Sequence, residues 1–596
     1  MKKYSYILLA LLCFACADEK KSDTSETTKN TTTFSAFLDD YYAKGLELNP
    51  LLATATGDHR FNDQFPNFLS DEHQEKLKEH YRFFKDSLQG FDNANLSESE
   101  QLSKAILNWD CDMNLRQLSF KNDLLMPINQ MWTLNLSVGQ LASGAGAQPF
   151  KTVEDYHNWL KRLEGYNTWL VTAKERMQEG IENEFVLPKS LIKKVIPQFE
   201  VLANTEVEKH LFYSPIKNFP KDFSDESQQE LKNKYTKFLT ETLIPTFKDI
   251  HQFLKQDYLN AGRESSGISA IPYGEAYYNH AIKNYTTTNM TADEIHELGL
   301  KEVVRILAEM EKVKTQVGYK GDLKSFFNYV RTNKELMPYD EPQQIIDNFN
   351  AIHEKMKPQI EKLFDLKPKT PFEVRRTEAF REASASAEYN QGSLDGTRPG
   401  IFYTPIPDAK TYNVFSDEAL FLHEAIPGHH YQISLTQENE KLPAFRKTLW
   451  YSAYGEGWAL YTESLGKELG LYTDPYQYFG MLGMEMHRAI RLVVDTGLHA
   501  KGWTREQAIA YSLSNEAESE ASIISEIERY MANPGQALSY KIGQLKIREL
   551  RARAKEQLGE KFDIKEFHNQ VLRTGCIPLQ LLEDKIDAWI QEKSAK

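Results

Sequence analysis

Apolar residues recur every three or four positions along most of this chain, a spacing that places them on one face of an α-helix. The stretch 291–313 also begins with a capping box, because Thr291 is followed three residues later by Glu294. We therefore predict a mainly α protein. No stretch after residue 34 has the composition of a linker, so we expect a single domain over 34–596. The clearest helical stretches are 34–50, 153–177, 230–259 and 345–364.

One region, residues 372–415, breaks this pattern with β-branched, aromatic and turn-forming residues. Asp395-Gly396 and Arg398-Pro399-Gly400 are typical of tight turns. We predict one small antiparallel β-sheet built from three short extended segments, at 372–377, 384–390 and 400–404. The sheet comes just before the segment that contains His423, so we expect it to lie beside that helix.

The N-terminus has the pattern of a targeting segment. Lys2 and Lys3 precede an apolar run over 7–15 that is too short to span a bilayer. The run ends at Cys16 and resembles a bacterial lipobox, which predicts a lipoprotein signal peptide over 1–16 with Cys16 as the lipidated residue. The alternative is an ordinary cleaved signal peptide. Residues 17–33 are polar and without apolar periodicity, so we expect a disordered tether.

A lipidated Cys16 implies the cell envelope of a Gram-negative bacterium, with the chain anchored to the outer membrane by its N-terminal lipid only. The side of the membrane stays open. The net charge of −14 and the lack of a Lys/Arg stripe exclude nucleic acid as the main partner. Of the four cysteines only Cys111 and Cys576 lie beyond the signal peptide. They are either a disulfide pair or two buried apolar side chains.

The segment HEAIPGHH, residues 423–430, begins like a zinc-peptidase helix. The familiar H-E-x-x-H spacing would require a histidine at 427, where this chain has Pro427. On an ideal helix, His429 lies about 9 Å along the axis from His423 and about 240° around it, too far to share an ion. Because Pro427 removes a backbone donor and Gly428 accepts unusual dihedral angles, an interrupted helix could bring them together. Alternatively, the helix simply ends there.

A third candidate ligand follows in GEGWALY, residues 455–461. Glu456 stands between two glycines at the start of an aromatic-rich helical stretch. Two histidines and one carboxylate are a common ligand set for catalytic Zn²⁺. We therefore predict one Zn²⁺ held by His423, His429 and Glu456, with His430 as the alternative to His429. Glu424 would be the general base. Otherwise Glu456 is a solvated helix residue.

Several motifs together resemble the bacterial domain-of-unknown-function family DUF885. They are HEAIPGHH, GEGWALY, SLDGTRPGIFY, RLVVDTGLHAKGWTREQAIAY and PGQALSYKIG. That family is in turn similar to the helical gluzincin metallopeptidases, which implies a helical body around a central cleft. The same resemblance implies His423 and His429 as zinc ligands, Glu424 as catalytic base and Glu456 as the third ligand.

The chain departs from the gluzincin pattern in two ways. It has two extra residues between the histidines, and Leu460 stands where many gluzincins have an acidic residue four positions after the ligand glutamate. A different group must therefore orient a ligand histidine, and Glu463 is the candidate.

Polar residues further along the chain are candidates for the rest of the site. His487, Arg491, Asp495 and His499 recur every four positions in an apolar helix. Either Arg491 and Asp495 form a salt bridge or they face a site; we expect His499 to face the substrate. Gluzincins use a Tyr or His donor for the oxyanion and an Arg for a peptide carboxylate. That resemblance implies Tyr530, before Tyr540, and Arg529 in these roles.

The sequence thus predicts a secreted, lipid-anchored zinc metallopeptidase. Its partner would be a peptide substrate, and an oligopeptide suits a central cleft better than a folded protein does. Two alternatives remain: a metal-dependent amide or ester hydrolase with other substrates, and a peptide-binding lipoprotein without catalytic activity. Glu424 argues against the second alternative, because a binding site needs no base beside its metal.

Overall fold

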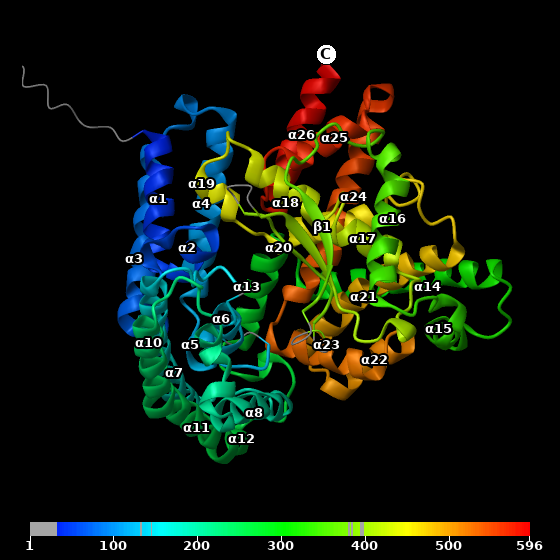
Figure 1. The fold of residues 1–596 in the computed structure, drawn as a ribbon. Helices are drawn as coiled ribbons and strands as arrows, with labels where there is room; N and C mark the ends of the chain where they lie inside the picture. Colours follow the sequence, from blue (N-terminus) through cyan, green and yellow to red (C-terminus); the bar gives the residue numbers. More distant parts are fainter. Residues whose placement is uncertain are drawn as a thin grey trace, which may run out of the picture.

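The computed structural model describes residues 33–595 except 132–133, 145, 379–381, 383–384 and 394–397. Cys16, the predicted signal peptide and the predicted tether up to residue 32 lie outside the described residues. Over the described part of the chain, helices predominate and form a mainly α protein, as the apolar spacing predicts (Figure 1). No described helix is both long enough and apolar enough to cross a membrane.

The N-terminal helices gather at one side of the molecule, coloured blue to green in Figure 1. They are α1 (Phe34–Leu48), α2 (Pro50–Thr56), α3 (Asp71–Ser87), α4 (Glu98–Gln117), α5 (Asn122–Leu125), α6 (Leu134–Ala142), α7 (Val153–Glu182), α8 (Lys189–Asn204), α9 (Ser214–Lys217), α10 (Asp225–Phe238), α11 (Ile244–Phe253) and α12 (Leu259–Ala261). Helices α4 and α7 begin with capping boxes, at Ser97 and Thr152. The predicted stretch 230–259 is a continuous helical run in which π-helical turns at Leu239–Leu243 and Leu254–Tyr258 separate α10, α11 and α12.

The remaining helices lie around the sheet and carry the candidate site. They are α13 (Gly274–Thr286), α14 (Ala292–Gln316), α15 (Leu323–Thr332), α16 (Pro342–Ile360), α17 (Asp417–Glu424), α18 (His429–Glu438), α19 (Ala444–Thr448), α20 (Ser452–Glu463), α21 (Pro475–Ala500), α22 (Arg505–Asn515), α23 (Glu520–Ala532), α24 (Ser539–Leu558), α25 (Ile564–Leu572) and α26 (Leu579–Ala595). The predicted capping box at Thr291 and Glu294 begins α14.

The small sheet has three strands, β1 (Phe372–Arg376), β2 (Glu388–Asn390) and β3 (Gly400–Thr404), in the order β1-β3-β2. The predicted positions are close to these, but the prediction of a purely antiparallel sheet is wrong. Strand β2 pairs antiparallel with β3, whereas β1 pairs parallel with β3. The reason is the strand order: β2 reverses the chain direction, so β3 runs the same way as β1, and β3 is the strand that lies next to β1.

Buried apolar side chains form two clusters. The smaller cluster is built between Phe65 and Tyr258, largely from α7, α8, α10 and α11. The larger cluster joins α1 and α4 to most of the chain after Ile268, and it includes Leu422 and Trp458 beside the candidate site. The candidate ligands are therefore carried on elements whose positions are fixed by the larger cluster.

Close packing of two glycines positions α20. A side-chain carbon added at Gly457 would lie 2.4 Å from the Cα atom of Gly543 in α24, so only glycine allows these helices to approach so closely. Gly457 follows Glu456 directly, which fixes the backbone beside this carboxylate against α24.

Both cysteines of the described chain, Cys111 and Cys576, are free and buried. They therefore act as buried apolar side chains, and the alternative of a disulfide between them is wrong.

Candidate metal centre

The helix that begins at Asp417 ends at Glu424, and a new helix begins at His429. Gly428 passes directly against the last turn of α17, because a side-chain carbon added there would lie 1.9 Å from the His423 carbonyl oxygen. The indole of Trp458 donates a hydrogen bond to the Pro427 carbonyl at 2.8 Å and holds the connection against α20. The interruption at Pro427-Gly428 thus turns the second histidine back toward the first.

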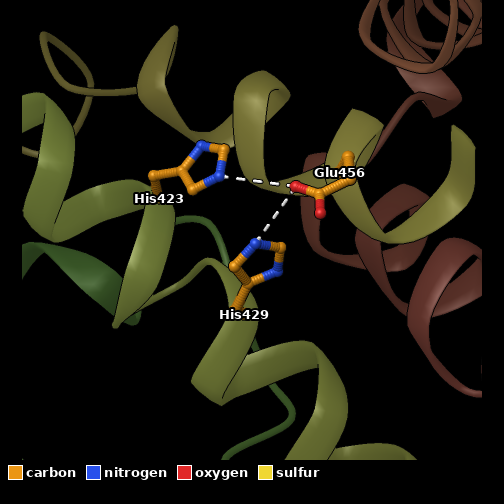
Figure 2. Close-up of side chains that lie close together, drawn as sticks. All are labelled: His423, His429 and Glu456. Atoms are coloured by element: carbon orange, nitrogen blue, oxygen red, sulfur yellow. Dashed lines mark ion pairs between the residues drawn. The ribbon is translucent and has the colours of Figure 1, made fainter. Parts of the chain in front are cut away.

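Three side chains converge at this interruption, as Figure 2 shows: His423 from α17, His429 from α18 and Glu456 from α20. The Nε2 atom of His423 lies 3.6 Å from Glu456 Oε2, and the Nε2 atom of His429 lies 3.3 Å from the same oxygen. One ligand atom from each residue falls within 4.8 Å of the other two. Ligand bonds of about 2.0–2.2 Å to a tetrahedral ion place ligand atoms at such separations. The three residues therefore fit a zinc ion.

Glu463 orients the first of these histidines. Its Oε1 atom lies 2.7 Å from His423 Nδ1. Because a carboxylate only accepts hydrogen bonds, Nδ1 donates to Glu463, which leaves Nε2 as the nitrogen that faces Glu456 and could bind a metal ion. The Tyr472 hydroxyl donates to the Glu463 carbonyl oxygen at 2.7 Å and supports this turn of the helix. The contact predicted for Glu463 is confirmed, and it replaces the acidic residue that is absent at Leu460.

His430, the alternative ligand, points elsewhere. Its Nδ1 atom lies 3.0 Å from the Tyr389 hydroxyl, and its ring packs 5.0 Å from the ring of Phe372 in the sheet. Burial lowers the pKa of His430 to about 4. The structure therefore brings His429, and not His430, to His423 and Glu456.

Burial and mutual contact perturb the charges of the centre. Burial lowers the pKa of His423, but hydrogen bonds to Glu456 and Glu463 outweigh it and raise the value to about 9. Burial raises the pKa of Glu456, but His429 and His423 outweigh it and hold the value well below the usual range. The carboxylate is thus ionised between two imidazoles, as a metal ligand must be.

Glu424 lies beside the three residues without belonging to the ligand set. It is the last residue of α17 and is buried. Burial raises its pKa, and His423 and His429 are near enough to oppose this rise. Its carboxylate is therefore an additional buried acidic group next to the three residues and outside the cluster that they form.

Glu456 also lines a cavity of about 810 Å³, which we call the Glu456 cavity. Its wall includes Trp450, Gln536 and Tyr540. The ring of Trp450 lies 5.9 Å from that of His429 and packs over Gly455, next to Glu456. Burial raises the pKa of Tyr540, and the charge of Glu456 adds to this rise. Of Tyr530 and Tyr540, Tyr540 is therefore the one that shares a cavity with Glu456.

Tyr530, which was predicted before Tyr540 as the oxyanion donor, lies outside the wall of the Glu456 cavity. The Tyr530 hydroxyl donates to Glu526 at 2.7 Å and accepts from Arg491 at 3.0 Å, and this residue does not line the Glu456 cavity. Arg529 is bound to Glu526 at 3.0 Å and to the amide oxygen of Gln536 at 2.6 Å, behind the cavity wall. Both residues belong to a network of contacts around Glu526, and this network packs against the wall of the Glu456 cavity through Gln536.

His499, which was predicted to face the substrate, is enclosed by backbone groups of other segments. It is buried, its Nδ1 atom accepts from the Ile268 amide at 2.9 Å, and its Nε2 atom donates to the Tyr530 carbonyl at 3.0 Å. Asp495 accepts from the Tyr278 hydroxyl at 2.6 Å. Arg491 forms its ion pair with Glu526 at 3.0 Å, and the Arg491–Asp495 salt bridge, one of the two alternatives for these residues, is absent from the described contacts.

The opposite wall of the Glu456 cavity comes from residues that sequence reasoning missed. They belong to the segment around α5 and to α13, and include Asp123, Tyr277 and Tyr285. No local pattern marks them as site residues, since only the packing of the N-terminal helices against the rest of the chain brings them to the cavity.

Comparisons with known proteins support this fold. The chain is similar to the crystal structure of a putative lipoprotein from Colwellia psychrerythraea, with 27% identity and a TM-score of 0.86 over 94% of this chain and 100% of that one. A putative lipoprotein of unknown function from Shewanella oneidensis has 20% identity and a TM-score of 0.68 over 93% of this chain and 99% of that one, which shows a shared fold. No curated protein matches the sequence.

The model of one protein family matches residues 50–586, which is most of the chain. The protein therefore belongs to the bacterial proteins of unknown function grouped as DUF885.

Proposed function

We propose that this protein is a lipid-anchored zinc hydrolase of the cell envelope, and specifically a peptidase that acts on oligopeptides. The observation that carries the proposal is the convergence of His423, His429 and Glu456 beside Glu424. A structural zinc site is normally closed by four protein ligands, whereas three ligands leave a position for water or substrate. The ligand set thus favours a catalytic ion.

A bound Zn²⁺ would supply a Lewis acid and an acidified water molecule. The side chains of the protein would do the rest. Glu424 would take the proton from the attacking water and pass it to the leaving nitrogen of the scissile amide. The hydroxyl of Tyr540, which shares the Glu456 cavity, would donate to the oxygen that becomes negatively charged in the transition state.

The cavity and the N-terminus support the substrate and the location. A volume of about 810 Å³ is within the range of sites that enclose small ligands, which suits a short peptide better than a folded chain. The lipobox-like end at Cys16 supports a lipid anchor, as does the similarity to a putative lipoprotein. We place the anchor in the outer membrane of a Gram-negative cell.

The proposal is tested with Glu424→Gln, which removes the base and keeps the shape of the side chain. We expect the variant to bind one zinc per chain and to lose about 100- to 10,000-fold in kcat on peptides, the usual contribution of a general base. The matched control is Glu440→Gln, which removes an exposed carboxylate in the loop after α18.

Metal content is measured by mass spectrometry of the purified proteins, and turnover with a peptide library and a set of non-peptide amides and esters. Unchanged turnover in Glu424→Gln would refute its role as base. A wild-type protein without stoichiometric metal would overturn the proposed function, and turnover of the non-peptide substrates alone would exclude a peptidase.

A further inference from the structure

The Glu456 cavity holds a second carboxylate. Asp123, the second residue of α5, lines the cavity together with Glu456, and these two are the only charged residues in its described wall. They come from opposite parts of the chain, because Asp123 belongs to the N-terminal helices and Glu456 to α20. One cavity therefore joins the candidate metal centre to a distant acidic group.

Asp123 has polar neighbours but no cation. Its carboxylate accepts from the Gln117 amide at 2.5 Å and from the Tyr277 hydroxyl at 3.4 Å. Among the described residues its contacts are with Gln117 and Tyr277, with no ion pair to a Lys, Arg or His, although it lines the cavity. Burial raises the pKa of Asp123, and the two hydrogen bonds oppose that rise. The Asp123 carboxylate therefore packs against Gln117 and Tyr277 and faces the cavity on its remaining side.

The two carboxylates differ in how their charges are compensated. Glu456 lies between His423 and His429, and a bound metal ion would add further positive charge at that end. Asp123 has no such compensation, so the far end of the cavity is negative. The aromatic residues Tyr277, Tyr285 and Trp450 also line the wall, and aromatic rings attract cations. The uncompensated negative charge of the cavity wall thus lies at Asp123.

We propose that Asp123 forms a subsite for a positively charged amine of the ligand whose scissile bond reaches the His423, His429 and Glu456 centre. This assignment rests on the proposed function, since it describes the substrate of the same site. The amine is either the N-terminal ammonium of a peptide or the ammonium of a lysine side chain, and both would replace the missing cation at the carboxylate. An ammonium supplies three donors, while Gln117 and Tyr277 leave acceptor positions on the carboxylate unused.

The subsite is tested by comparing three peptides of equal length: one with a free N-terminus, the same peptide N-acetylated, and an N-acetylated peptide that contains one lysine. Binding is measured by calorimetry on the zinc-loaded Glu424→Gln protein, with and without Asp123→Asn. The asparagine keeps an acceptor for Gln117 and removes the charge. Asp123→Glu, which restores the charge, and Asp257→Asn, which removes an exposed carboxylate outside the cavity, are the controls.

We expect the free amine to bind about tenfold more tightly than the acetylated peptide, and Asp123→Asn to abolish this difference. Asp123→Glu should restore part of the difference, and Asp257→Asn should leave it intact. If the acetylated lysine peptide binds more tightly than the acetylated peptide without lysine, the subsite takes a lysine side chain. If these two peptides bind equally and only the free N-terminus binds more tightly, the subsite takes the N-terminal ammonium. Equal affinities for all three peptides in the protein with Asp123, or a preference that survives Asp123→Asn, would overturn the proposal.

The two proposals fail in different ways. If the wild-type protein hydrolyses peptides but acetylation changes neither KM nor affinity, the subsite is wrong and the peptidase stands. If no peptide is hydrolysed while Asp123 still controls amine binding, the peptidase is wrong and the amine subsite stands.

Discussion

The orientation of His423 is set by two carboxylates that approach opposite nitrogens of its ring. Glu463 holds Nδ1 at 2.7 Å, and Glu456 lies 3.6 Å from Nε2. A ring held in this way keeps one tautomer and one direction, which lowers the cost of ordering the site when a metal binds. His429 has no such partner, because its buried Nδ1 atom makes no hydrogen bond. Its position depends on Trp450 and on the backbone around Gly428.

Two adjacent histidines allow a sharp test of the ligand set. We expect His429→Ala to lower zinc affinity on the order of a hundredfold or more, because it removes one of the three proposed ligands. His430→Ala should retain one zinc per chain, because this side chain contacts Tyr389 and Phe372 instead. Competition with a chromophoric chelator gives both affinities. The reverse order would show that His430 completes the centre.

At the residue scale, the sequence indicated the candidate residues that can be recognised from their immediate neighbours. His423 and Glu424 stand out because the Pro427-Gly428 break follows them, and Glu456 stands out because a glycine lies on each side of it. Glu463 lies about two helical turns after Glu456. Tyr530 and Tyr540 could not be ranked, since α23 and α24 must first pack before one hydroxyl faces the cavity and the other faces Glu526. Asp123 could not be assigned to the cavity from the sequence for the same reason.

Among the elements, the connection from α17 to α18 does most to build the centre. Four residues join two short helices, and α20 donates hydrogen bonds to both the connection and α17: Trp458 donates to the Pro427 carbonyl, and Thr462 donates to the Leu422 carbonyl in α17. The helix that carries Glu456 thus also holds the break that places His429. By contrast, the parallel pairing of β1 with β3 was not predictable, because strand order depends on long-range packing and not on alternation within a strand.

Gly428→Ala tests this connection. The added carbon would lie 1.9 Å from the His423 carbonyl oxygen and 2.3 Å from that of Leu422, so the backbone must shift. We expect a loss of about 1–3 kcal/mol in the free energy of unfolding, typical of overpacking, and weaker zinc binding because His429 moves away from Glu456.

Gly483→Ala is the matched control, since a side-chain carbon there would meet no atom within 4 Å and the residue lies inside α21. We expect it to stabilise the protein by about 0.5–1 kcal/mol and to leave zinc affinity unchanged. Thermal denaturation and metal titration measure both effects. Full zinc affinity in Gly428→Ala would show that the close approach of residue 428 to α17 is not what positions His429.

Over the whole molecule, α21 connects the candidate site to the rest of the chain. It packs against α14, and its residue His499 joins the segment at Ile268 to the Tyr530 carbonyl of α23. Sequence reasoning took His499 for a substrate contact because a polar residue in an apolar helix is expensive to bury unless it is paired. His499 is indeed paired, but its partners are backbone groups of Ile268 and Tyr530 in other segments. A local sequence pattern cannot predict such partners.

The neutral His499 makes the stability of the protein depend on pH. Burial lowers the pKa of His499 to about 3, whereas a histidine in the unfolded chain titrates near 6.5. The folded group therefore stays neutral, and its contribution to the free energy of unfolding is complete above about pH 6.5. Below that pH the unfolded chain binds a proton that the folded chain does not. The contribution is lost at up to about 1.4 kcal/mol per pH unit as the pH falls toward the folded pKa.

Urea denaturation of wild type and His499→Gln between pH 7 and pH 4 tests this account. We expect the variant to be less stable at pH 7 by about 1–3 kcal/mol, because a buried hydrogen-bonding pair is disrupted. Its stability should also fall less steeply with acid than that of the wild type, because one titrating group is gone. Val493→Ala, a buried and uncharged position of the same helix, controls for destabilisation alone and should keep the wild-type slope. If His499→Gln also kept that slope, the imidazole of His499 would take up its proton in the folded protein as readily as in the unfolded chain.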